Sequence, residues 1–170
     1  MTLDMVARDG LVLLGCGKMG TALLTGWLAA GVPAQSVWVI EPHPSDWLQA
    51  SGVHLNKGVP AAPAVALLAV KPQMMGAALP ALQALGNGKT LFVSIAAGTS
   101  IATFAEALGA QTPIVRTMPN TPAMVGRGIT GICANEFAGA AGLALTRSLM
   151  QAVGQVVELE GEHQIDAVTG

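Results

Sequence analysis

The feature that most constrains the fold is a glycine loop near the amino terminus. A short apolar run, residues 11–14, is followed at once by Gly15, Gly17 and Gly20 in a G-x-G-x-x-G pattern. The Ala- and Leu-rich segment over residues 19–30 then reads as a helix, which a glycine and a proline terminate. A buried strand that passes through three spaced glycines into a helix predicts the first unit of a doubly wound α/β sheet.

Each glycine of this loop has a physical task. Gly15 permits a tight turn, Gly17 lets the backbone approach a pyrophosphate, and Gly20 lets the helix pack closely on the strand. The free amides at the start of the helix would then hold the phosphate groups. The alternative is a glycine-rich turn that binds nothing, but the strand before it and the helix after it favour a dinucleotide site.

The rest of the chain continues the alternation of strand and helix. This order predicts a Rossmann-type, doubly wound and mostly parallel sheet with helices on both faces. The strands are expected over residues 37–40, 53–55, 65–70, 90–95, 114–117, 129–134 and 156–159. The helices are expected over residues 44–50, 73–85 (interrupted at Pro80), 101–108 (capped by Thr99 or Ser100) and 138–152.

Composition narrows the class of protein. The chain has 170 residues, 52% apolar and 11% charged, with a net charge of −2, which excludes a disordered chain and argues against a nucleic-acid partner. No uninterrupted apolar stretch is long enough for a membrane span, and the first nine residues lack the order of a signal peptide. The two cysteines, Cys16 and Cys133, exclude a disulfide scaffold and fit a reducing, cytoplasmic compartment. The low charge suggests that other protein covers some apolar surface.

An acidic residue follows the second expected strand. Glu41 lies 21 residues after Gly20, about the spacing at which an acid accepts hydrogen bonds from the ribose 2′-hydroxyl of NAD. A 2′-phosphate would instead require a cation, and Pro42, His43 and Pro44 supply none beyond a partial charge on the histidine. The pattern favours NAD over NADP, with a solvated loop carboxylate as the alternative.

Polar residues also follow three other strands. Lys71, Ser94 and Asn120 stand where the fourth, fifth and sixth strands end, and ligands of open α/β sheets bind at the carboxyl ends of the strands. Lys71 could instead be a solvated lysine, and Asn120 could form an Asx turn before Pro122. The histidines are scattered, so no metal site is expected. Both cysteines are interpreted as packing residues, and Met74, Met75 and Met124 as core or interface residues.

The order and spacing of four motifs resemble pyrroline-5-carboxylate reductase. These motifs are Leu14-Gly-Cys-Gly-Lys-Met-Gly20, Leu68-Ala-Val-Lys-Pro-Gln73, Ser94-Ile-Ala-Ala-Gly98 and Arg116-Thr-Met-Pro-Asn-Thr-Pro122. The segment Glu162–Thr169 is similar to the stretch that leads into the family's second domain. The resemblance implies reduction of 1-pyrroline-5-carboxylate to L-proline with NADPH or NADH, the last step of proline biosynthesis.

The resemblance also assigns roles to individual residues. It places the pyrophosphate on the glycine loop, the adenosine ribose at the end of the second strand, and the nicotinamide at the ends of the fourth to sixth strands. Lys71 and Asn120 are the candidate catalytic residues, which would position the nicotinamide or a bridging water. The implied cofactor-binding residues are Leu14, Gly15, Cys16, Gly17, Lys18, Met19, Gly20, Glu41, Pro42, His43, Asn56, Ala69, Val70, Lys71, Pro72, Ala97, Gly98, Met118, Pro119 and Asn120.

The family continues into an all-helical domain that forms a dimer and supplies most of the substrate pocket. We therefore expect residues 1–160 to form the dinucleotide-binding domain and residues 161–170 to begin the connection to that helical domain, which this sequence does not include. The implied partners are the small-molecule substrate and a second copy of the full-length protein. Two alternatives stay open: the amino-terminal domain of a β-hydroxyacid-dehydrogenase-like enzyme, and a nucleotide-sensing module without catalysis.

Overall fold

The centre of the fold is a set of short strands buried on both faces. In a computed structural model, which describes residues 2–165, these are β1 (Leu11–Leu14), β4 (Val65–Leu68), β5 (Leu91–Ser94) and β6 (Ile114–Met118). Helices cover both faces, so the strands need no alternation of apolar and polar residues. This is why β1 and β4 are continuous apolar runs in the sequence.

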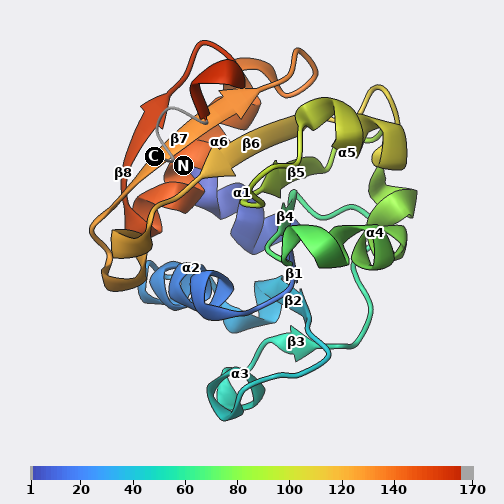
Figure 1. The fold of residues 1–170 in the computed structure, drawn as a ribbon. Helices are drawn as coiled ribbons and strands as arrows, with labels where there is room; N and C mark the ends of the chain where they lie inside the picture. Colours follow the sequence, from blue (N-terminus) through green and yellow to red (C-terminus); the bar gives the residue numbers. More distant parts are fainter. Residues whose placement is uncertain (1, 166–170) are drawn as a thin grey trace.

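All the strands belong to one sheet, whose order is β3-β2-β1-β4-β5-β6-β7-β8 (Figure 1). The remaining strands are β2 (Val37–Ile40), β3 (His54–Leu55), β7 (Gly128–Ala134) and β8 (Gly154–Glu158). Neighbouring strands are parallel except for β6 and β7, which are antiparallel. The order 3-2-1-4-5-6 is that of the Rossmann fold, with its switch point between β1 and β4. The predicted fold class is confirmed.

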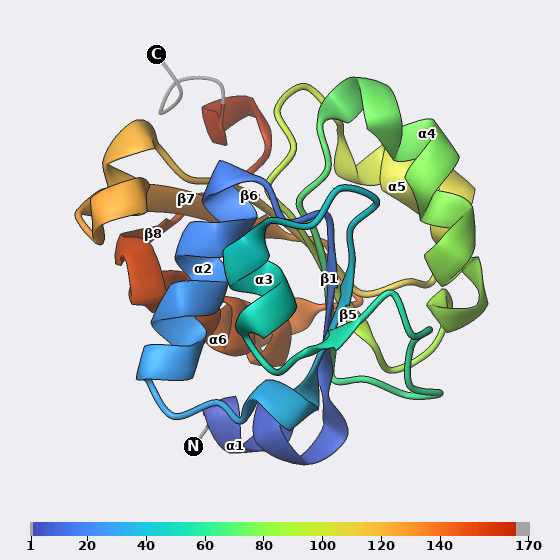
Figure 2. The ribbon, with the colours of Figure 1, turned by 90° about the horizontal axis from the view of Figure 1, so that it is seen from below.

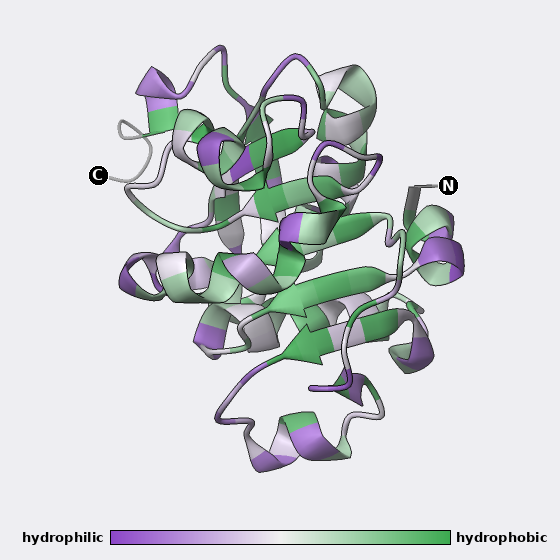
Figure 3. Ribbon diagram, turned by 90° about the vertical axis from the view of Figure 1, so that its right-hand side faces the viewer, coloured by the Kyte–Doolittle hydropathy of each residue, from purple (hydrophilic) through white to green (hydrophobic). Residues whose placement is uncertain are grey.

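The helices form two layers, one on each face of the sheet (Figure 2). Alternate residues of β1 belong to two different cores: Leu11 and Leu13 to one, Val12 and Leu14 to the other. The first core includes residues from α1 (Thr2–Asp9), α2 (Lys18–Ala29), α3 (Asp46–Ala50) and α6 (Gly139–Met150). The second includes residues from α4 (Met75–Ala78), η3 (Leu79–Leu85) and α5 (Ile101–Leu108). Figure 3 shows the hydrophobic strands between these layers.

Helix α2, which follows the glycine loop, is fixed by close packing. A Cβ added at Gly26 would lie 2.8 Å from Cβ of Ala152, so the helix approaches η5 (Gln151–Val153) more closely than any side chain would allow. One residue further on, Trp27 is fully buried and its Nε1 donates to the carbonyl of Leu149 at 2.9 Å. These contacts set the direction in which the start of α2 points.

Some elements differ from the sequence-based expectation. The helix α1 was not predicted; its buried Val6 joins the first core. The helix expected over residues 73–85 is three short pieces, η2 (Pro72–Met74), α4 and η3, with Pro80 near the start of the last. This is the interruption expected at Pro80, because a proline removes a backbone donor. Ser100, one of the two candidates, caps α5. Within residues 2–165, no helix has the length and apolar character that crossing a membrane requires.

Candidate dinucleotide site

The glycine loop lies at the switch point of the sheet and leaves an open approach to its backbone. Gly15 has φ +87°, and a Cβ there would lie 2.8 Å from Cγ1 of Val70, so the tight turn requires glycine. A Cβ at Gly17 would meet nothing within 4 Å. Gly17 precedes the first residue of α2, and no side chain caps this helix. The first amides of α2 are therefore available to an anion.

A cavity of about 550 Å³ runs along this loop. It lies between the end of β1, the end of β2 and the turn after β4. These are three segments that the sequence analysis predicted to form one site. Besides Ile40 at the end of β2, the apolar residues Met74, Ala77, Ala78 and Ala81 form a wall that sequence reasoning missed. The predicted site residues that line the cavity are Leu14, Gly15, Cys16, Gly17, Glu41, Pro42, His43, Ala69, Val70 and Lys71.

The carboxylate of Glu41 is hydrogen-bonded to the glycine loop itself. Its Oε1 accepts from the backbone N–H of Cys16 at 2.9 Å, and its Oε2 accepts from that of His43 at 3.0 Å. Each oxygen has a second lone pair and can still accept from a ribose hydroxyl. The structure therefore places the negative charge beside the phosphate loop, between the two segments expected to hold the adenosine half.

Asn56 acts on the backbone of Glu41. Its Oδ1 accepts from the N–H of Glu41, and its Nδ2 donates to the carbonyl of Glu41, both at 2.8 Å. Asn56 has φ +54°, a left-handed conformation that asparagine tolerates better than most residues. The side chain that the family resemblance assigned to the adenosine side thus holds the end of β2 in place and does not line the cavity.

The two cysteines are buried thiols. Burial raises the pKa of Cys16, the hydroxyl of Thr21 lowers it, and the nearby Glu41 carboxylate raises it further. Burial, then the charge of Glu162, raises the pKa of Cys133. Neither environment favours a nucleophilic thiolate, as their interpretation as packing residues requires. Across residues 2–165, no three His, Cys, Asp or Glu side chains gather as a metal ion would need.

The predicted residues at the ends of β5 and β6 lie outside the first cavity. Ala97 and Gly98 are exposed in the loop before α5, whereas Met118 is buried beside Cys133 and Ile165. Asn120 does not form the Asx turn considered above: its Oδ1 accepts from the N–H of Ile129 at 2.8 Å. That bond fixes the amide and leaves its Nδ2 as the group that can donate elsewhere.

A second cavity, of about 730 Å³, lies on the other side of the glycine loop. Cys16 and Gly17 border both cavities, and Lys18 lines the second one together with residues of η4 (Thr121–Val125). Met124 lines it and is 44% exposed, whereas Met74 lines the first cavity and is 53% exposed. Of the three methionines assigned to a core or interface, only Met75 is buried.

Together, the 3-2-1-4-5-6 strand order, the uncapped glycine loop and the adjoining acid define a dinucleotide-binding domain of the Rossmann class. Residues 11–98, more than half of the chain, match the protein family described as "NADP oxidoreductase coenzyme F420-dependent". The chain belongs to this family, and a nicotinamide dinucleotide is therefore its cofactor class.

The curated relatives give a narrower comparison. The chain is 38% identical over 165 residues to pyrroline-5-carboxylate reductase from Pseudomonas aeruginosa, covering 94% of this chain and 60% of the relative. It is 34% identical over 168 residues to the Escherichia coli enzyme of that name, covering 92% and 61%. A solved pyrroline-5-carboxylate reductase from Coxiella burnetii matches with a TM-score of 0.88 and 30% identity, over 94% of this chain and 62% of that one.

These comparisons confirm the resemblance identified from the four motifs. The chain spans about 60% of the length of the curated relatives that it matches.

Proposed function

We propose that this chain is the cofactor-binding part of an enzyme that reduces 1-pyrroline-5-carboxylate to L-proline with a nicotinamide dinucleotide. The observation that carries the proposal is the first cavity, in which the glycine loop, Glu41 and Lys71 meet at the switch point of the sheet. The similarity of nearly the whole chain to pyrroline-5-carboxylate reductases supports this substrate over others that the same fold can serve.

The residues present fit a dinucleotide. The space above Gly17 and the uncapped amides of α2 suit the pyrophosphate. Glu41 and His43 lie where the adenosine ribose would run, and the apolar wall that includes Met74 and Ala78 suits a planar base. The nicotinamide half would continue past Lys71 towards Ala97, Gly98 and Asn120, at the carboxyl ends of the next strands.

The proposed reaction requires the protein mainly to align the cofactor with the substrate. A bound nicotinamide dinucleotide supplies a hydride, and a protonated cyclic imine is already a good electrophile. The task of this chain is to hold donor and acceptor carbons close and in line, for which effective molarities can lower the barrier by roughly 7 kcal/mol or more. Lys71 and the free amide group of Asn120 would orient the nicotinamide, its ribose or a bridging water.

We propose that NADH binds at least as well as NADPH. The family description names NADP, but the carboxylate of Glu41 lies beside the glycine loop and within the cavity. A 2′-phosphate next to that carboxylate would be repelled, and no lysine or arginine stands among the residues that directly follow Glu41.

Titration of the chain with NADH, followed by the change in nicotinamide fluorescence, tests the proposal. Gly17→Val should abolish binding and leave the fold intact, because the added side chain enters open space that the pyrophosphate would need. Gly88→Val is the matched control, since a Cβ there makes only an ordinary contact, 3.5 Å from the carbonyl of Leu85, before the start of β5. Unchanged affinity in Gly17→Val would remove the loop from the site.

A further inference from the structure

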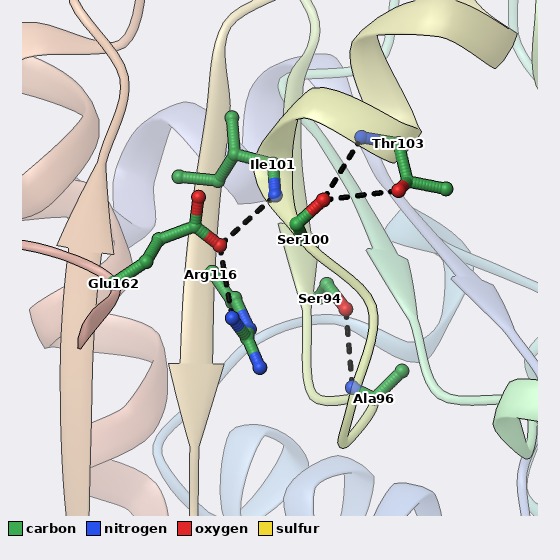
Figure 4. Close-up of polar contacts among 7 residues, drawn as sticks. All are labelled: Ser94, Ala96, Ser100, Ile101, Thr103, Arg116 and Glu162. Carbon is green, nitrogen blue, oxygen red and sulfur yellow. Dashed lines mark hydrogen bonds and ion pairs between the residues drawn. The ribbon is translucent and has the colours of Figure 1, made fainter. Parts of the chain in front are cut away.

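A partly buried ion pair lies beside the loop that leads from β5 to α5. The side chain of Arg116, in the middle of β6, is only 7% exposed, and its Nη1 donates to Oε2 of Glu162 at 2.9 Å (Figure 4). The same oxygen accepts from the backbone N–H of Ile101, the first residue of α5, at 3.0 Å. One carboxylate oxygen therefore joins β6, the start of α5 and the segment that follows β8.

The start of α5 has two separate acceptors. Ser100 caps the helix, with its Oγ accepting from the N–H of Thr103 at 3.2 Å. Glu162 accepts from the amide of Ile101, which that cap leaves without a partner. A carboxylate at a helix N-terminus is also favoured by the helix dipole. Glu162 thus fixes the end of the loop where it joins α5.

The other end of this loop is fixed by Ser94, which is fully buried at the end of β5. Its Oγ accepts from the N–H of Ala96 at 3.0 Å, and its carbonyl accepts from Oγ1 of Thr117 at 2.9 Å. The exposed Ala97 and Gly98 stand between the Ser94 anchor and the Glu162 anchor. Their position depends on both.

Glu162 is itself held against the domain. The N–H of Leu159 donates to the carbonyl of Ile132 at 2.9 Å, which extends the contact of this segment with β7. Ile165 is fully buried in a cluster with Met118 and Cys133, and Leu159 packs against the same cluster. The segment over residues 159–165 is therefore seated on the β6–β7 face, and its carboxylate has a defined position.

We propose that Glu162, fixed by Arg116, is a positioning residue for the nicotinamide end of the site, because it sets the loop that carries Ala97 and Gly98. The inference rests on the proposed function. It adds to that function a residue that lies outside every cofactor motif, more than 140 residues from the glycine loop.

The test compares two ligands on the 170-residue chain by calorimetry: NADH, which contains the nicotinamide, and ADP-ribose, which lacks it. Glu162→Gln should weaken NADH binding about fivefold, because a neutral amide oxygen is a weaker acceptor than a carboxylate, and change ADP-ribose binding by less than about twofold. Glu158→Gln is the matched control, because Glu158 pairs with Arg147 at 3.0 Å on a more exposed surface. It should change neither affinity.

A double variant separates positioning from stability. Arg116→Leu with Glu162→Ala removes the buried charge along with its partner, so stability should recover relative to Glu162→Ala alone. The amide of Ile101 still lacks its acceptor, so NADH binding should stay weak while ADP-ribose binding is normal. Recovery of NADH affinity together with stability would overturn the proposal.

The other possible results of the calorimetry distinguish failure of the positioning role from failure of the proposed function. Equal losses for both ligands in Glu162→Gln, or no loss for either, would reject the positioning role while the proposed function stands. A wild-type chain that binds neither ligand would instead reject the proposed function.

Discussion

Replacing Glu41 by serine should change both cofactor choice and stability. A carboxylate and a 2′-phosphate of nearly two charges, a few ångströms apart in a partly hydrated site, repel by about 1.5–3 kcal/mol, which corresponds to roughly tenfold to hundredfold in relative affinity. We expect Glu41→Ser to raise the NADPH-to-NADH affinity ratio by about this factor. The loss of acceptors for the amides of Cys16 and His43 should lower the free energy of unfolding by about 1–2 kcal/mol, because Glu41 is only half-buried and water replaces part of each bond.

Calorimetry with both cofactors measures the ratio, and thermal unfolding measures the stability. A loss of about 1–2 kcal/mol corresponds to a melting temperature lower by roughly 2–8 °C for a chain of this size. Glu106→Ser is the control for the change in charge, because Glu106 is exposed on α5 and lies outside both cavities. A wild-type chain that strongly prefers NADPH, or an unchanged ratio in Glu41→Ser, would refute the reasoning.

Three other outcomes follow from the same structure. Gly26→Ala should destabilise the fold by about 1–3 kcal/mol in urea unfolding, because its Cβ would lie 2.8 Å from Cβ of Ala152. An unchanged midpoint of urea unfolding would contradict this packing. Burial raises the pKa of the Cys16 thiol above its usual range. Its alkylation at neutral pH should therefore be slower than that of a free thiol and should accelerate only at higher pH. Fast alkylation at pH 7 would show an exposed thiolate. The 170-residue chain should bind NADH yet show no oxidation of NADH with pyrroline-5-carboxylate, because Arg116 is buried, pairs with Glu162 and is not free to hold the substrate carboxylate. Steady oxidation of NADH by this chain in the presence of that substrate would contradict this.

The positions of the strands along the chain could be predicted because each strand is marked by its own composition. The glycine loop fixes where β1 ends, and Ser45 and Ser100 cap the helices that follow them. The helix α1 was missed because its residues mix Asp4, Arg8 and Asp9 with apolar ones and contribute little to the core beyond Val6. No long apolar face marks such a segment in the sequence.

The candidate site was predictable where the chain leaves its backbone open to a ligand. The spacing of glycines such as Gly15 and Gly17 can be recognised directly in the sequence. The apolar wall formed by Ala77, Ala78 and Ala81 was not found, because alanines in a broken helix carry no chemical signal. The role of Asn56 was assigned by family resemblance to the ligand, whereas its two hydrogen bonds go to the backbone of Glu41.

Two residues share a role that no sequence pattern shows: each has a polar side chain that satisfies a backbone group of another segment. Asn56 holds the end of β2, and Glu162 holds the start of α5. No spacing rule reports such pairs, because partners 15 or 61 residues apart meet only after the sheet has formed. They nevertheless decide how accurately the exposed backbone is presented, since a backbone approach to a cofactor tolerates little displacement. The adenosine and nicotinamide ends of the proposed site are thus each fixed by a side chain that need not touch the cofactor. Substitution of Asn56 should weaken binding of the adenosine half, and substitution of Glu162 should weaken binding of the nicotinamide half.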